Sequence, residues 1–145
     1  MFGASIASVM TGKNLLTATP YTTVAQVAIL MAERKMSAVM VVDGEGRLAG
    51  IFTERDAVHR VIARQLDPQA TPIGKVMTAN PLCVEPRETF GYALLQMHEH
   101  GFRHMPVVEN GRPVGMVSAR NALDPELEEF ESEARRRKYI RRYAG

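Results

Sequence analysis

The stretch GIFTERDAV, residues 50–58, returns 65 positions later as GMVSARNAL, residues 115–123. Both copies open with glycine and two apolar residues, continue with a hydroxyl residue, and place an arginine directly before Asp56 or Asn121. The apolar pair is typical of a short buried strand, and the hydroxyl residue is typical of a helix start. The repetition indicates that the chain contains two copies of one structural unit.

The rest of the chain supports this repeat. VMT at 9–11 recurs at 76–78, and residues 38–56 align with residues 104–121. The offset between the copies drifts from 67 to 65, and each lost residue falls in a turn. Surface turns tolerate deletions better than helices or strands, so this drift favours a structural repeat.

Each copy has the same predicted order of strand, helix, strand, strand and helix. The first helix follows Thr23 or Thr89, because the apolar residues after each recur at helical spacing. Two short apolar runs around a glycine-containing turn predict a hairpin, and Thr53 or Ser118 begins the second helix. A unit of about 60 residues is only marginally stable alone, so we expect the copies to pack together.

The predicted fold class is α+β with α/β-like features: two βαββα units and a C-terminal helix. We expect the first unit over residues 8–63, a proline-containing linker over 64–75, the second unit over 76–125 and a final helix over 126–145. The final helix is expected to pack on its own module or on a dimer partner. Its bases gather near its end, where they complement the helix dipole.

Composition sets further limits. Of 145 residues, 46% are apolar and 23% charged, as in ordinary globular proteins, and a net charge of +2 does not by itself imply a nucleic-acid partner. The single cysteine, Cys83, excludes an internal disulfide framework. We expect its thiol to be buried, because Cys83 aligns with Leu16, an apolar strand position, in the repeat. No apolar run approaches the roughly 20 residues that span a bilayer, and no secretory signal is evident, so we expect a cytoplasmic protein with no membrane partner. No metal set or nucleophile–base pair stands out, so we expect no catalytic residue, metal site or catalytic cofactor.

The repeat resembles a tandem pair of CBS domains, a Bateman module, over about residues 8–125. The motifs that carry the resemblance are VMT at the start of each unit, GIFTERD in the first and RHMPVVENGRPVGMVS in the second. The resemblance is to the stand-alone type. It implies that the units pack sheet to sheet about a pseudo-two-fold axis and that two modules form a homodimer. It also implies a regulatory role in binding AMP, ATP, NAD(H) or, less favoured, S-adenosylmethionine between the units, and an effector protein that the sequence does not name.

Thr53 and Asp56 allow two interpretations. A hydroxyl at the helix start and a carboxylate three residues later form a capping box, which stabilises a helix by about 1 kcal/mol. The same carboxylate can accept hydrogen bonds from a ribose diol, and the hydroxyl can reach a phosphate. Arg55 can add charge-assisted contacts to phosphate. Gly50 would let the backbone approach closely.

The resemblance implies a first ligand site around Asp56 and Thr53. It places Arg103 and His104, from the opposite unit, at the phosphates of this site. The candidates around the adenine are apolar or small residues that can equally belong to the core: Thr17, Met36 and Ala38.

A second, weaker site is expected around Asn121, Ser118 and Arg120. An amide can bind a ribose diol but carries no charge, and Ser37 brings no cation to the phosphates. The adenine candidates here are Val84 and Phe102, with His104 shared.

A different class of function stays open. The repeats could be a scaffold that binds no ligand, and the basic RRRKYIRR segment at 135–142 could carry binding to a protein or nucleic acid.

Overall fold

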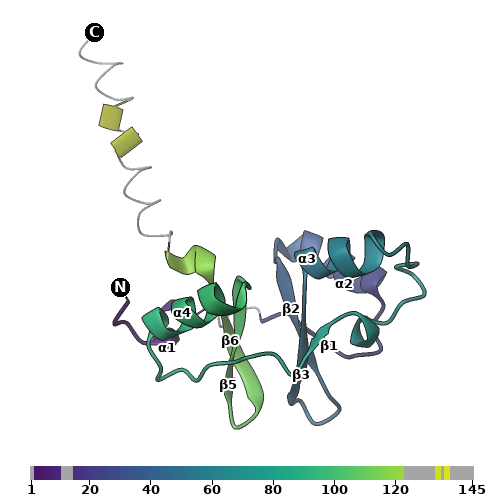
Figure 1. Ribbon diagram of the computed structural model, residues 1–145, viewed down its shortest axis with the longest axis horizontal. Helices are drawn as coiled ribbons and strands as arrows, with labels where there is room; N and C mark the ends of the chain where they lie inside the picture. Colours follow the sequence, from purple (N-terminus) through teal and green to yellow (C-terminus); the bar gives the residue numbers. More distant parts are fainter. Residues whose placement is uncertain (1, 11–14, 123–132, 135, 138–145) are drawn as a thin grey trace.

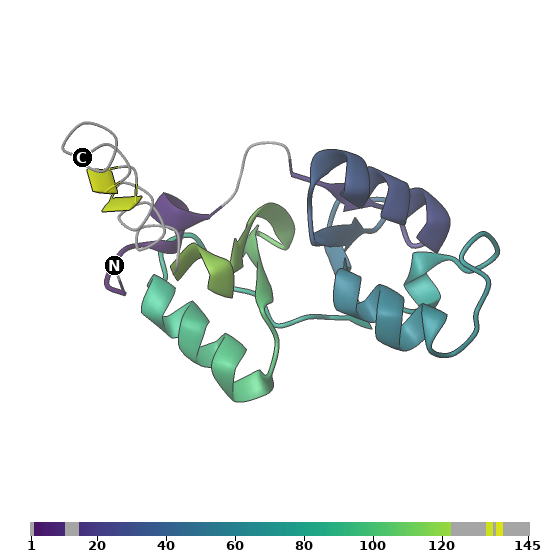
Figure 2. The ribbon, with the colours of Figure 1, turned by 90° about the horizontal axis from the view of Figure 1, so that it is seen from above.

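The computed structural model describes residues 2–10, 15–122, 133–134 and 136–137, and these form two αβ lobes (Figures 1 and 2). The first lobe contains a four-stranded sheet in the order β1-β2-β3-β4. Its elements are β1 (Thr17–Ala18), α2 (Val24–Arg34), β2 (Ala38–Val42), β3 (Leu48–Thr53), α3 (Glu54–Asp56), η1 (Ala57–Ile62), η2 (Ile73–Lys75) and β4 (Thr78–Ala79). β1 runs parallel to β2, and the other pairs are antiparallel.

The second lobe repeats this plan around the antiparallel pair β5-β6. Val84 adds a parallel bridge to Val107, as β1 does to β2. The elements of this lobe are α1 (Ile6–Val9), α4 (Phe90–His100), β5 (His104–Glu109), β6 (Arg112–Ser118) and the 3₁₀ turn η3 (Ala119–Ala122). The predicted α+β fold class is therefore confirmed.

Local sequence explains the long helices. The side chain of Thr23 accepts a hydrogen bond from Gln26 N–H, and Gln26 returns one from the backbone of Thr23, which completes a capping box for α2. Thr89 accepts from Tyr92 N–H at the start of α4. α4 ends at Gly101, whose φ of 74° lies in the left-handed region that glycine adopts without strain.

β2 is buried on both faces, which explains why its sequence does not alternate. Val39 and Val41 join the core under α2, whereas Ala38 and Met40 belong to a separate cluster on the opposite face. Ile51 from β3 and Met116 from β6 complete that cluster. The two sheets therefore pack against each other through one face of each, as the resemblance implied.

The hairpin turns of the two lobes also meet. Leu48 N–H donates to the carbonyl of Gly111 at 2.9 Å, and Arg112 Nη1 donates to the carbonyl of Glu45. These contacts hold together the hairpin ends of the two sheets.

The short helix that precedes each repeat packs in the lobe formed by the other repeat. α1 lies beside α4 in the second lobe (Figures 1 and 2), where Ile6 is fully buried. η2 packs in the first lobe, where Ile73 is fully buried. The segment predicted as a linker, residues 64–75, therefore ends in a turn that contributes to the first core. The unit boundaries themselves stay a prediction.

The second helix of the first repeat is wound unusually. It begins as α3 and continues as the π-helix η1, with Ala63 N–H bonded to the carbonyl of Val58, five residues back. Short π-helical turns are rare and frequently lie at functional sites.

Cys83 is exposed, so the prediction of a buried thiol is wrong. That prediction aligned Cys83 with the buried Leu16. The strand pairing instead matches Val84 with Ala18, because their partners Val107 and Val41 are equivalent in the two hairpins. The offset at this point is therefore 66 residues, and Cys83 corresponds to the exposed Thr17.

The predicted C-terminal helix over 126–145 lies almost wholly outside the described residues, as does most of the basic segment. The residues of that range that are described are 133–134 and 136–137, which are helical, and Arg137 pairs with Glu133 at 2.9 Å. Within the described ranges, no helix combines the length and the apolar character that crossing a membrane requires.

Gly50 tests the packing of β3 against the segment that links the lobes. A Cβ at this position would meet Met77 Sδ and would lie 2.8 Å from the carbonyl oxygen of Thr78. The close approach that Gly50 allows is therefore made by Met77 and Thr78 of the chain itself.

We expect Gly50→Ala to lower the free energy of unfolding by about 1–3 kcal/mol in urea denaturation. Gly44→Ala, with nothing within 4 Å of its Cβ, is the control and should change stability by less than about 0.5 kcal/mol. Equal stability of both variants would contradict this account.

Candidate functional site

Thr53 and Asp56 form a complete capping box where β3 passes into α3. The hydroxyl of Thr53 accepts from Asp56 N–H at 3.2 Å, and Asp56 Oδ2 accepts from Thr53 N–H at 3.0 Å. The carboxylate is thereby held at the end of the strand, with its side chain 13% exposed. The capping interpretation of this motif is confirmed, and it leaves part of the carboxylate accessible.

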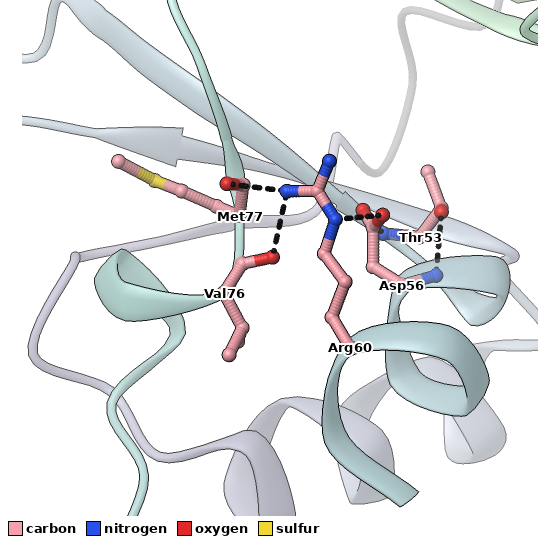
Figure 3. Close-up of polar contacts among 5 residues, drawn as sticks. All are labelled: Thr53, Asp56, Arg60, Val76 and Met77. Atoms are coloured by element: carbon pink, nitrogen blue, oxygen red, sulfur yellow. Dashed lines mark hydrogen bonds and ion pairs between the residues drawn. The ribbon is translucent and has the colours of Figure 1, made fainter. Parts of the chain in front are cut away.

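Arg60 is a member of this cluster that the sequence analysis missed. Its Nε lies 3.5 Å from Asp56 Oδ1, and its Nη1 donates to the carbonyls of Met77 at 3.0 Å and Val76 at 3.3 Å (Figure 3). The available signal was the four-residue spacing of an acid and a base on one helix. The contact with residues 76–77 could not be read from the sequence, because it depends on the tertiary path of the chain.

The second copy reproduces one of the two capping-box hydrogen bonds, without the charge. Asn121 Oδ1 accepts from Ser118 N–H at 2.8 Å and lies 3.3 Å from the Ser118 hydroxyl. An amide therefore satisfies the backbone at this helix start as a carboxylate does in the first copy.

His104 joins the two repeats. Its Nε2 lies 2.7 Å from the hydroxyl of Ser37, and the carbonyl of Ser37 accepts from Glu54 N–H at 3.0 Å. The structure thus brings His104 to the helix start that carries Asp56. The backbone of His104 pairs with Ser118, so the residue lies between the two capping motifs.

The remaining predicted residues are spread over surface and core. Ala38 is buried and pairs with Thr53, Met36 packs at the edge of the first core, and Val84 and Phe102 belong to the second core. The exposed members are Thr17, Arg55, Arg103 and Arg120. The geometry therefore gathers Thr53, Asp56 and Ala38 at one helix start and Ser118 and Asn121 at the other, with His104 between them.

One shallow depression of about 290 Å³ lies elsewhere, lined by Glu85, Pro86, Arg87, Glu109 and Asn110. None of these is a predicted ligand residue. Within the described ranges no group of three or more His, Cys, Asp or Glu side chains is placed to hold a metal ion.

Comparison with known proteins explains the repeated fold. The family model for the CBS domain matches residues 6–63 and again residues 73–125. The chain belongs to the CBS domain family. It carries two CBS domains in tandem, which confirms the resemblance drawn from the motifs.

Similar proteins extend this finding. The CBS domain-containing protein CBSCBSPB1 of Arabidopsis thaliana is 35% identical over 86% of this chain, but the match spans only 23% of that relative's length. A solved structure from Pyrococcus horikoshii, of an uncharacterized conserved protein, is 30% identical with a TM-score of 0.80, covering 87% of this chain and 94% of that one. A putative signal-transduction protein with CBS domains from Burkholderia ambifaria is 31% identical with a TM-score of 0.79, covering 86% and 95%.

Two more distant CBS structures share the fold and were solved with ligands. The CBS domain protein PAE2072 of Pyrobaculum aerophilum, 23% identical with a TM-score of 0.75, was solved with AMP, and the match covers 81% of this chain and 89% of that one. The CBS domain pair of protein MJ0100, 20% identical with a TM-score of 0.77, was solved with 5′-methylthioadenosine and S-adenosyl-L-methionine, with 87% and 98% covered.

His104 makes stability depend on pH. Burial lowers its pKa below the ordinary value of 6.5, and Arg103 lowers it further, while Glu54 opposes the shift. The folded protein therefore binds this proton less tightly than the unfolded chain. Its contribution to stability is complete above pH 6.5 and declines as the pH falls below that value.

When the pH is lowered from about 7.5 to about 5, we expect the melting temperature of His104→Gln to fall by less than that of wild type. Glutamine keeps a hydrogen-bonding group toward Ser37. His98→Gln, at an exposed position on α4, is the control and should follow the wild-type profile. Parallel profiles for wild type and His104→Gln would refute the assignment.

Proposed function

We propose that this CBS pair is a non-catalytic regulatory module that binds an adenosine-containing nucleotide at the start of α3. The observation that carries the proposal is the Asp56 carboxylate, which is anchored by a backbone hydrogen bond and remains partly exposed. Each of its oxygens has one polar contact in the structure, so each can still accept a hydrogen bond from one hydroxyl of a ribose diol. The AMP and S-adenosylmethionine complexes of the two distant CBS structures support this class of ligand.

The phosphate end of the ligand would be met by the second repeat. His104 already reaches across the seam to Ser37, and Arg103 beside it is exposed and permanently charged. A nucleotide that bridges Asp56 and these two residues would touch both CBS domains. It would bias their relative orientation by the difference between its affinities for the two arrangements.

The Asn121 site is proposed to bind more weakly. Its amide forms the cap but presents no charge to a ribose, and a hydrogen bond to a charged acceptor is roughly twice as strong as a neutral one. The first site therefore sets the response to AMP, ATP or NAD(H).

We also propose that two modules form a homodimer through their helices. Exposed apolar side chains lie on α2 at Ile29, on η1 at Val58 and Ile62, and on α4 at Tyr92 and Leu95. Paired helix faces would cover these side chains and remove their apolar area from water, which is favourable.

The decisive test of ligand binding is calorimetric titration of AMP, ATP, NAD+, NADH and S-adenosylmethionine into wild type and Asp56→Asn. An asparagine oxygen can accept the backbone hydrogen bond of the residue at the helix start, as Asn121 does from Ser118, so the variant removes the charge and keeps this contact. We expect at least one ligand to bind wild type and its affinity to fall about tenfold or more in Asp56→Asn.

Asn121→Asp provides the reciprocal variant and should strengthen or create the second binding event. Equal affinities of wild type and Asp56→Asn would exclude Asp56 as the ribose contact. Failure of all five compounds to bind folded, nucleotide-free protein would exclude the sensor function.

The dimer is tested by light scattering after size-exclusion chromatography. Ile62→Glu places a charge on the proposed interface and should yield a monomer, because burying an unpaired carboxylate is strongly unfavourable. Tyr21→Glu, at a side chain that is 88% exposed in a loop, is the control and should remain dimeric. A monomeric wild type, or a dimeric Ile62→Glu variant, would overturn this interface.

A further inference from the structure

Arg60 connects the proposed ligand site to the segment that leads from the first lobe to the second. Its guanidinium lies between two groups of acceptors: the Asp56 carboxylate on one side and the carbonyls of Val76 and Met77 on the other (Figure 3). A planar guanidinium has donors in fixed directions, so it can hold both partners at once. The backbone hydrogen bond that Asp56 accepts at the helix start does not need this cation, because Asn121 accepts the equivalent bond as a neutral amide.

The 76–77 segment lies shortly before the chain leaves the first lobe. Val76 is buried in the first core, and Met77 N–H donates to the carbonyl of Ile73 at 2.8 Å. β4 follows at once and pairs with β3, after which the chain continues to Val84 in the second core. A displacement of the Val76 and Met77 carbonyls therefore acts on the connection between the domains.

We propose that Arg60 is a positioning residue that couples occupancy of the Asp56 carboxylate to this connecting segment. The inference rests on the proposed nucleotide site. A ribose hydroxyl that donates to Asp56 Oδ1 shares this oxygen with the guanidinium and weakens the ion pair. The guanidinium then shifts relative to the carboxylate, and its hydrogen bonds carry the change to Val76 and Met77.

The coupling is specific to the first repeat. The residue four positions after Asn121 is Pro125, which has no cationic side chain. A nucleotide at the second site would therefore meet no cation at this spacing, and the proposed response of the module follows the first site.

Hydrogen–deuterium exchange of the peptide covering residues 76–80 tests the coupling. The amides of Met77 and Asn80 are suited to it, since both are hydrogen-bonded, to Ile73 and Ala49 respectively. Exchange is measured without nucleotide and at saturation with the tightest binder among AMP, ATP, NAD+ and S-adenosylmethionine. Saturating each variant separately removes the effect of any change in affinity.

The variants are Arg60→Gln, Arg60→Lys and the control Arg64→Gln, which removes the same charge from a nearby exposed position. Arg60→Lys keeps the charge but cannot bridge the carboxylate and both carbonyls. It replaces Arg60→Gln in the test if the glutamine variant does not fold stably. We expect the nucleotide to change exchange at 76–80 by about threefold or more in wild type and Arg64→Gln. The change should be lost in both Arg60 variants although nucleotide is bound.

Two results would overturn the coupling and leave the nucleotide site intact. In one, wild type binds nucleotide without any change at 76–80. In the other, a saturated Arg60 variant shows the full wild-type change. If no nucleotide binds wild type, the proposed function and the coupling fall together.

Discussion

The packing of one sheet on the other is the interaction on which the rest of the molecule depends. A sheet covered by helices on one face must bury its other face, and here the sheet of each CBS domain is covered by the sheet of the other. Met40 and Ile51 of the first domain meet Met116 of the second in a shared apolar cluster. The strands can be apolar at successive positions because each face of β2 has its own core.

Polar contacts lie at both ends of this apolar seam. At the hairpin end, Leu48 and Arg112 donate hydrogen bonds across the seam to backbone carbonyls. At the other end, where strands pass into helices, Ser37 and His104 meet through side chains. The hairpin contacts end on backbone carbonyls, whereas the Ser37–His104 contact involves a titratable imidazole and can respond to pH. The proposed ligand sites lie at this second end.

Stability and function use the same residues at the helix starts. The capping box explains a hydrogen-bonding side chain at Asp56, and the equivalent amide of Asn121 shows that no charge is needed for that purpose. The charge of Asp56 has a separate partner in Arg60, which in turn contacts the segment between the domains. The two repeats can therefore both have a stabilising contact at the helix start and still differ in their proposed response to ligand. The exchanged helices α1 and η2 add a further link, since each packs in one lobe and leads the chain into the other.

The repeat, the order of elements, the long helices and the two capping motifs could be predicted from the sequence. The helices and capping motifs depend on spacing within a few residues: Thr53 and Asp56 are three positions apart, as are Ser118 and Asn121. The contacts between distant groups could not be predicted in this way: Arg60 with the carbonyls of residues 76–77, His104 with Ser37, and Ile6 with the second core. The exposure of Cys83 could not be predicted either, since a one-residue difference in strand register reverses the face to which a side chain points. Short-range hydrogen bonds are encoded by neighbouring residues, whereas contacts between lobes depend on the path of the whole chain.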